Sequence, residues 1–535
     1  MARLEIPLEN LVPEIYPIIA SHLPLHATPS TLLSLALINR YVHQIVMPIL
    51  HSRLILKNES DAIAMLQKLA ENPTFGRVVR ELHIMSNLSK ESRRQNPPVD
   101  VIQRVQDVIL HGNLPFLHSL DLQILHVYYY HENTSAPGLG QLRKEFCKRV
   151  KEQCPRLKCF HLEGFQDYNN SGWMEESGCF EVTGLTSLTV KMTDQILKKS
   201  GRVILFKHIS SLATSLHTLH LRLGANSPFD SGTFINPPSP ILELNFPHLR
   251  SLSLSSFFPI DTEQSTAFFI RHPSLEYLDI TTDLMWYAKS IWIASTLPSE
   301  FLPKLRHLRA GWKDVRVLAP ILHLLITLSI HNSVNGQIPY LLRKVIPTGL
   351  PKLRSLGIGQ WESNACPYQD SALQEGQDWC ETSEGKKFQV KRGHQSRTVF
   401  DNYMHSVVRG APNLEEIAFY RDHYLSSFPS IADRFNKLSL LKRLFYRSFY
   451  ERTIVYERTI AEREEFIKEA TTLMQAVPAL ESISNAYPSH LPFLEAKAER
   501  SETGILVGVN VGEGFGMTVG YDDDAFPWAP ANGQL

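Results

Sequence analysis

The sequence lacks three features: a net charge, a long apolar run and a leader segment. Of its 535 residues, 54 are Lys or Arg and 54 are Asp or Glu, so the formal net charge is zero. Proteins that bind nucleic acids usually carry a basic excess that neutralises phosphates. No stretch approaches the roughly 18 consecutive apolar residues that cross a bilayer, and the first residues show no charged-then-apolar leader. We therefore expect a soluble protein of the cytoplasm or nucleus, with neither nucleic acid nor a membrane as its partner.

The sequence is also poor in the patterns that mark metal sites and catalytic sites. Its six cysteines are irregularly spaced and form no Cys-x-x-Cys pair, which argues against a zinc site and a disulfide framework. Many of the 22 histidines fall in separate copies of one repeated phrase, without the i, i+4 spacing of a metal-ligand pair. Neither a Gly-x-Ser-x-Gly elbow nor a Gly-x-x-x-x-Gly-Lys-Ser/Thr loop occurs. We expect a protein without catalytic residues, cofactors or metals.

What the sequence does contain is a repeated phrase, Pro-x-Leu-x-x-Leu-x-apolar. Its alternating apolar residues predict a short strand, and the proline before it predicts the end of a preceding helix. Segments with helical spacing lie between the phrases, at Leu142–Val150, Thr262–Arg271 and Glu462–Val477. Copies begin at Pro115, Pro155, Pro247, Pro273, Pro303, Pro351, Pro412 and Pro478, and copies without the proline begin at Leu185, Leu216, Leu325 and Leu441.

The spacing of the copies predicts a stacked array. The leading leucines Leu216, Leu249, Leu275 and Leu305 follow one another at intervals of 26 to 33 residues. A strand–turn–helix unit of this length cannot bury its apolar face alone, but a row of units shares one core. Residues 78–490 resemble the leucine-rich-repeat family in its irregular, helix-containing form. The family's Asn or Cys after the last apolar position is mostly absent, with Gly224 at one such place.

The resemblance implies an α/β solenoid with parallel strands on one face and helices on the other. We expect it to span residues 53–500, with an insertion at about 359–397. After it, Ile505, Val507, Val509 and Val511 alternate with less apolar residues. This alternation predicts a C-terminal hairpin, with its second strand at Met517–Tyr521, and an acidic tail within residues 501–535.

Residues 1–52 predict a small all-α module before the repeats. Pro13 can start a helix that carries Ile15, Ile18, Ile19 and Leu23 on one stripe. A second apolar helix is expected from Ser30 through Ile45, so the module is expected to hold two to three short helices.

These residues resemble the F-box family. Leu11-Val12-Pro13-Glu14-Ile15 is similar to the family's opening helix, and Leu32 to Arg40 is similar to its second helix. His43, Val46, Pro48 and Leu50 resemble the closing segment of fungal F-box proteins, although Val42-His43 stands where the family has a tryptophan. The resemblance implies binding to a Skp-type adaptor through Pro13, Glu14, Ile15, Ile18, Leu23, Leu33 and Leu37.

An F-box followed by leucine-rich repeats implies the substrate-recognition subunit of a Skp–cullin–F-box ubiquitin ligase, which binds a target protein through the repeats. The target is expected on the strand face, where polar residues of successive phrases form one surface. These residues are His161, Glu163, Thr218, His220, Arg222, Tyr277, Asp279, His307, Arg309 and Tyr420.

Two alternatives remain open at this point. In the first, the protein is a leucine-rich-repeat interaction scaffold without a ligase role, and its N-terminal helices only cap the solenoid. In the second, it is an enzyme of unfamiliar type built on the array, which would need a pocket with convergent ionisable residues.

Overall fold

The computed structural model describes residues 12–22, 28–87, 99–123, 146–163, 181–193, 199–224, 239–255, 261–281, 290–333, 337–360, 382–383, 387, 397–420, 429, 432–446, 460–485 and 493–514. The chain forms two compact units, Met1–Asn226 and Ser227–Leu535. Within the described residues, no helix combines the length and the apolar character that crossing a bilayer requires.

The first unit contains three helices followed by an alternation of strands and helices. Its described strands are β1 (Arg53–Asn58), β2 (Glu81–Asn87), β3 (Ser119–Gln123), β4 (Cys159–Glu163), β5 (Ser187–Thr193) and β6 (Thr218–Gly224). Its described helices are α1 (Ile15–His22), α2 (Thr28–Ala36), α3 (Arg40–Ser52), α4 (Glu59–Glu71), α5 (Pro73–Gly76), α6 (Val99–Leu110), α7 (Phe146–Gln153) and α9 (Lys199–Leu212).

The second unit continues the alternation with shorter helical turns. Its described strands are β7 (Ser251–Ser255), β8 (Tyr277–Thr281), β9 (His307–Gly311), β10 (Thr327–Ser333), β11 (Ser355–Gln360), β12 (Glu416–Tyr420), β13 (Arg443–Tyr446), β14 (Ser482–Asn485), β15 (Phe493–Arg500) and β16 (Leu506–Gly514). Its described helical segments are α10 (Ser239–Glu243), α11 (Thr262–Ile270), η3 (Ala294–Thr296), α12 (Trp312–Val317), η4 (Ala319–Leu324), α13 (Gln337–Tyr340), η5 (Leu341–Val345), α15 (Arg397–Gly410), α16 (Ala432–Phe435) and α17 (Ile460–Ala476).

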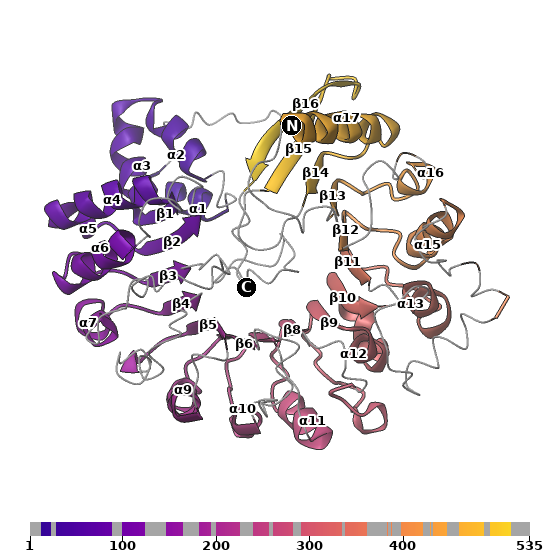
Figure 1. Ribbon diagram of the computed structural model, residues 1–535, viewed down its shortest axis with the longest axis horizontal. Helices are drawn as coiled ribbons and strands as arrows, with labels where there is room; N and C mark the ends of the chain where they lie inside the picture. The colour runs from indigo at the N-terminus through magenta and orange to yellow at the C-terminus, as the bar shows by residue number, and fades with distance from the viewer. Residues whose placement is uncertain are drawn as a thin grey trace, which may run out of the picture. The chain divides into compact units, whose positions relative to one another are not determined.

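In each unit the strands pair in chain order. All neighbours from β1 to β6 are parallel, and so are all neighbours from β7 to β14. The helices that connect the strands of each unit lie along one side of those strands (Figure 1). Each unit is therefore a solenoid-like α/β array, which confirms the predicted α/β class and the layering of strands and helices.

All twelve copies of the phrase form strands, from β3 to β14. Where the proline is present it lies four residues before the strand, as Pro115 does before Ser119. The leucine two residues after it closes a turn instead of entering the strand: Leu117 N donates to Leu114 O at 3.2 Å, and Leu305 N donates to Leu302 O at 3.0 Å. Proline fits this turn because its missing N–H removes no sheet hydrogen bond there.

The strand registers align up to five positions, shown by Ser119, Leu120, Asp121, Leu122 and Gln123 in β3. The second position holds an apolar side chain at most 6% exposed in every strand from β1 to β14. Because alternate residues share a face, positions two and four form the apolar face and positions one, three and five form the opposite face, here called the odd face. Each buried leucine contributes about 1.5–3 kcal/mol. The second-position residues are Leu54, Leu82, Leu120, Phe160, Leu188 and Leu219 in the first unit, and Leu252, Leu278, Leu308, Leu328, Leu356, Ile417, Leu444 and Ile483 in the second.

Three local expectations need correction. The helix expected from Ser30 to Ile45 ends at Ala36 and restarts at Arg40, because the Asn39 side chain caps α3 by accepting from Val42 N at 2.8 Å. The strands β15 and β16 are antiparallel, unlike the rest of the expected solenoid. The hairpin pairs β16 with the preceding β15, whereas Met517–Tyr521 and the acidic tail lie outside the described residues. Most of the insertion at 359–397 also lies outside them.

Candidate functional site

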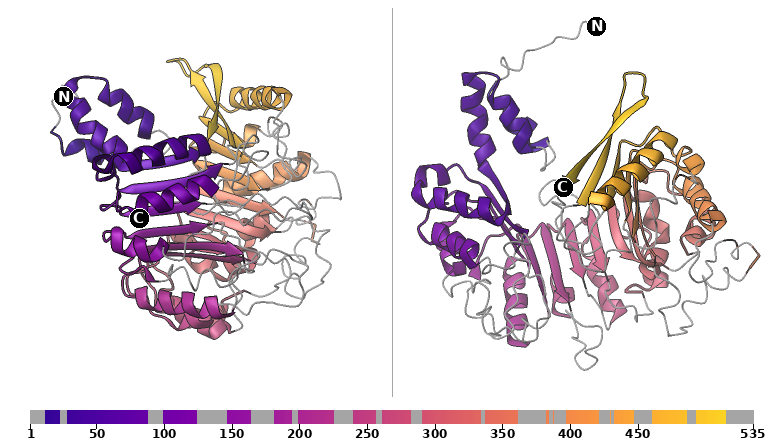
Figure 2. Two further views of the ribbon diagram at one scale, coloured as in Figure 1. Left: turned by 60° about the vertical axis from the view of Figure 1, so that its left-hand side comes forward. Right: turned by 45° about the horizontal axis from the view of Figure 1, so that its top comes forward.

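The first candidate surface belongs to α1, α2 and α3, which cluster at the start of the first unit, ahead of β1 (Figure 2). These helices share a small core of Tyr16, Ala20, Leu32, Ala36, Val42 and Val46, each at most 8% exposed. The buried residues recur at i and i+4 in each helix, so each helix turns one stripe inward.

The residues predicted to bind an adaptor lie mainly outside this core. Pro13 and Glu14 are exposed in the turn before α1, and Ile15 is half-buried. Ile18 is 53% exposed, Leu33 49% and Leu37 77%, while Leu23 lies outside the described residues. Leu33 and Leu37 are one turn apart, since Leu37 N donates to Leu33 O at 3.2 Å, so they face the same side of the chain.

Three further large apolar side chains of the module are exposed: Val12, Ile38 and Tyr41, at 57%, 44% and 49%. Sequence reasoning missed Ile38 and Tyr41 as surface residues because it continued one helix through residues 37–39, whereas Val12 lies ahead of α1. The cap at Asn39 is the signal that could have found Ile38 and Tyr41, since a new helix begins there with its own inward stripe at Val42 and Val46. Together Val12, Ile18, Leu33, Leu37, Ile38 and Tyr41 are called the exposed module residues below.

The second candidate surface is the odd face of each unit. The registers place all ten predicted target-binding residues at odd positions of their strands. The first positions are Thr218, Tyr277 and His307, the third positions are His161, His220, Asp279 and Arg309, and the fifth positions are Glu163, Arg222 and Tyr420. The side chains of Glu163, Arg222 and Tyr420 lie outside what the structure describes.

The third position differs from the expected solvated surface. His161, His220, Asp279 and Arg309 expose only 3–6% of their surface, whereas Thr218, Tyr277 and His307 are half-buried. Buried polar groups are costly unless they are hydrogen-bonded or paired. The middle of the odd face is therefore a polar interior held by contacts between neighbouring strands.

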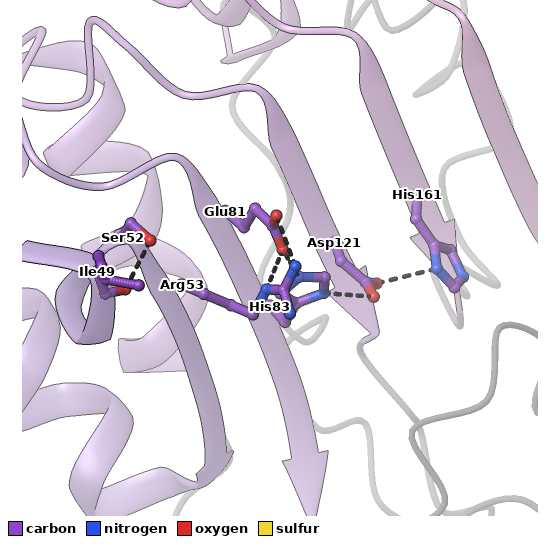
Figure 3. A network of polar contacts seen from close by, with 7 residues as sticks. All are labelled: Ile49, Ser52, Arg53, Glu81, His83, Asp121 and His161. Carbon is purple, nitrogen blue, oxygen red and sulfur yellow. Dashed lines mark hydrogen bonds and ion pairs between the residues drawn. The ribbon is translucent and has the colours of Figure 1, made fainter. Parts of the chain in front are cut away.

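In the first unit these contacts form the charged row, a chain of Arg53, Glu81, His83, Asp121 and His161 (Figure 3). Arg53 Nε and Nη2 donate to Glu81 at 2.5 and 2.9 Å. His83 Nε2 lies 3.4 Å from Glu81 Oε2, and its Nδ1 lies 3.1 Å from Asp121 Oδ2. His161 Nδ1 reaches the other oxygen of Asp121 at 3.0 Å.

The geometry of the charged row fixes the charge of His83. Both of its ring nitrogens face carboxylate oxygens, and only the imidazolium can donate from both nitrogens. Burial opposes that charge, but the hydrogen bonds to Asp121 and Glu81 outweigh burial and raise the pKa of His83 to about 9. Burial likewise opposes ionisation of Glu81, yet hydrogen bonds from His83 and Arg53 lower its pKa to about 2. The pKa of Asp121 is lowered too, because His161 and His83 overcome the effect of its burial.

In the second unit the corresponding contacts form the arginine cluster: Ser253, Asp279, Arg309, Ser329 and His331. Arg309 Nη1 donates to Asp279 Oδ2 at 3.4 Å, and Ser253 Oγ donates to the same oxygen at 3.2 Å. Arg309 Nε donates to His331 Nε2 at 2.6 Å, which requires that this nitrogen carry no proton.

Next to this cluster, two first-position residues stay partly accessible. The rings of Tyr277 and His307 lie 6.5 Å apart, and His307 Nδ1 is 3.1 Å from Thr327 Oγ1. Burial, aided by the charge of Arg306, lowers the pKa of His307. Among those of the ten predicted residues whose side chains the structure describes, these two are partly exposed aromatic side chains with polar atoms.

Sequence reasoning missed Arg53, Glu81, His83, Asp121 and His331 as members of polar networks. Asp121 and His331 occupy the third and fifth positions of recognised strands, so the strand alternation could have flagged them. β1 and β2 carry no recognisable phrase, and the pairing of their side chains with β3 depends on a register that sequence alone does not fix.

No model of a protein family matches the chain, and no curated protein is significantly similar to it. Over the part of the chain that the structure describes, no group of three or more His, Cys, Asp or Glu side chains is arranged to hold a metal ion. The two candidate surfaces must therefore be interpreted from their own chemistry, which is apolar and exposed on the module and polar and paired on the odd faces.

Proposed function

We propose that this protein is the substrate-recognition subunit of a Skp–cullin–F-box-type ubiquitin ligase, working in the cytoplasm or nucleus. Its N-terminal module binds the adaptor, and the odd faces of its repeats bind a target protein. The protein itself performs no chemistry and acts by holding the target close to the ligase's catalytic partners.

The observation that carries the proposal is the exposure of Leu33 and Leu37, at 49% and 77%, on a module whose core is complete without them. Large apolar side chains gathered on a surface mark sites of protein association. Four of the six exposed module residues fall between Leu33 and Tyr41, which concentrates apolar surface at the end of α2 and the start of α3.

The experiment is capture of a Skp-type adaptor with its cullin by the full chain. Changing Leu33→Asp and Leu37→Asp together adds two charges to the apolar surface and leaves the module core untouched, so adaptor capture should fall at least tenfold. Val203→Asp is the matched control, because Val203 is 62% exposed on α9 and lies outside the module. If the unaltered chain captures no adaptor, or if the double variant captures it normally, the ligase proposal is wrong.

A second candidate function is an interaction scaffold whose three helices cap the array. One observation favours it: α3 ends at Ser52 and β1 begins at Arg53, with no linker between them. In a pure cap, no captured protein binds Leu33 and Leu37, so the double aspartate variant would leave every captured protein unchanged. Comparing the proteins captured by the unaltered chain and by the double variant separates the two functions.

The target-binding half of the proposal has its own test. Tyr277→Ala with His307→Ala removes the accessible aromatic contact of the odd face in the second unit while leaving the buried Asp279 and Arg309 in place. Capture of the target should fall, while adaptor capture stays normal. If capture of the target and capture of the adaptor are both lost, the variant is unfolded. If neither is lost, Tyr277 and His307 do not take part in target binding.

A further inference from the structure

The last described strand of the second unit presents one free side. β16 pairs with β15 from Phe493↔Gly514 to Arg500↔Leu506, and among the described residues no strand pairs with its other side. Backbone N–H and C=O groups of an antiparallel strand point alternately to its two sides. The Val511 carbonyl points away from β15, since it accepts a hydrogen bond from Arg463 of α17 at 2.9 Å. Val509, two residues earlier, points its N–H and C=O to the same free side.

Apart from Arg463, the described residues give this free side little of the usual protection of a sheet edge. Edge strands normally discourage pairing with charged residues, prolines or covering segments. From Leu506 to Gly512, β16 has no charged residue and no proline. Val507 is 72% exposed, and Ile505, in the turn just before the strand, is 67% exposed. β-branched residues of this kind favour extended pairing.

The sequence of β16 indicates what pairs with it. Reading outward from Asn510, Val509 mirrors Val511 and Gly508 mirrors Gly512. A two-fold axis requires that the same surface serve both partners. If two copies of β16 pair antiparallel with Asn510 on the axis, valine stands across from valine and glycine across from glycine. Glu513, the one charged residue of the strand, falls across from Val507 of the other copy, so the two carboxylates do not oppose each other.

We propose that two copies of this protein associate through the free side of β16, antiparallel and centred on Asn510. In this arrangement Val509 N–H donates to the Val511 carbonyl of the second copy, and the symmetric bond forms in return. Arg463 already donates to that carbonyl, but a carbonyl oxygen has two lone pairs and accepts both bonds. The sheet of one second unit then continues into the sheet of the other. A contact built on one strand per copy is small, so the dimer should be reversible and depend on concentration.

The sharpest test is a disulfide at the axis. Asn510 is exposed, and in this register the two Asn510 residues form a non-hydrogen-bonded pair with Cα atoms about 4.5 Å apart. That separation lies inside the range of about 4.4–6.8 Å that disulfides span. Asn510→Cys in the full chain, treated with diamide, should give a covalent dimer on a non-reducing gel.

The matched control is Val507→Cys. Its two copies stand six residues out of register, about 20 Å apart at roughly 3.4 Å per residue, so they should not link. Val507 is strongly exposed, so random collisions would link Val507→Cys at least as fast as Asn510→Cys. The unaltered chain under the same oxidant shows how much cross-linking arises from its six native cysteines. If Asn510→Cys links no faster than Val507→Cys, the proposed register is wrong.

A second measurement requires no cysteine. Sedimentation of the unaltered chain should show a monomer–dimer equilibrium. Val509→Pro removes one outward N–H from each copy and is tolerated on an edge strand, so it should raise the dimer dissociation constant about tenfold or more. Circular dichroism checks that the variant folds. A chain that stays monomeric at every concentration overturns the proposal, and so does a dimer that Val509→Pro leaves unchanged.

Discussion

Both polar networks run through the third positions of the odd faces, but they pair their buried charges differently. In the charged row, two carboxylates enclose His83, and the outer pair of Arg53 and Glu81 stays 27% and 30% exposed. In the arginine cluster, the cation is Arg309, and its side chain and that of Asp279 are 7% and 4% exposed. The first network thus depends on a proton, whereas the second depends on a permanent charge that is buried with its partner.

This difference predicts different responses to alkaline pH. Raising the pH removes the proton that holds Glu81, His83 and Asp121 together, but it leaves Arg309 charged. Alkaline pH should therefore weaken the charged row and leave the cation of the arginine cluster in place.

The largest effect is expected in the arginine cluster. Asp279→Ala removes the carboxylate that faces the buried Arg309 and should lower the free energy of unfolding by about 3–5 kcal/mol. Glu81→Ala in the charged row should cost less, about 1–2 kcal/mol, because water reaches that pair. Hydrogen exchange followed separately in β7–β10 and β1–β4 would assign each loss to its unit.

The matched control for both variants is Glu415→Gln. Glu415 pairs with Arg354 at 3.5 Å, and both side chains are more than 40% exposed. Exposed pairs contribute little, so the change should stay below about 0.5 kcal/mol. If Asp279→Ala lowers the free energy of unfolding as little as Glu415→Gln does, the arginine cluster does not depend on a buried ion pair.

The next effect concerns the proton on His83. Its folded pKa of about 9 lies above the ordinary value of 6.5, so the folded state holds the proton more tightly than the unfolded state. The resulting stabilisation, about 1–3 kcal/mol, is fully present below pH 6.5 and is lost as pH rises through 9. The lowered pKa of Glu81 acts in the other direction, since its contribution is present above pH 4.5 and is lost as pH falls towards 2.

Urea unfolding of the full chain and of His83→Gln at pH 6, 7.5 and 9.5 measures this contribution. The difference in unfolding free energy between the two proteins should be largest at pH 6 and shrink towards pH 9.5. If this difference in unfolding free energy does not change with pH, His83 is not a protonated, positively charged side chain in the folded protein.

Structural features that repeat along the chain could be predicted from the sequence, and features that do not repeat could not. The twelve phrases predict twelve strands because each carries its own turn and apolar alternation, and the same alternation puts all ten predicted target residues on the odd faces. The networks are different, because Arg53, Glu81, His83 and Asp121 come from three strands whose register is set by packing. The burial of Asp279 and Arg309 also depends on parts of the same polypeptide outside their own strands, and the strand pattern does not describe those parts. The break between α2 and α3 was missed because one residue, Asn39, interrupts an otherwise continuous helical pattern.

The smallest effect concerns a buried carboxylate, Asp314, which accepts hydrogen bonds from neutral donors. Asp314 accepts from Ser290 Oγ at 2.7 Å and from Ile291 N at 2.9 Å, yet burial outweighs these bonds and raises its pKa to about 6. A raised pKa favours the folded state only while the group is protonated, so this stabilisation is present below pH 3.8 and is lost as pH rises through 6.

Asp314→Asn keeps an oxygen that accepts both bonds and removes the buried charge, so at pH 7 it should change the unfolding free energy by no more than about 1 kcal/mol. Between pH 4 and 7, urea unfolding should show the variant gaining stability relative to the unaltered chain. Asp261→Asn is the control, because one oxygen of Asp261 also accepts two hydrogen bonds, both from backbone N–H groups, at 2.8 and 3.1 Å, but Asp261 is exposed. If both substitutions depend on pH alike, burial is not what distinguishes Asp314.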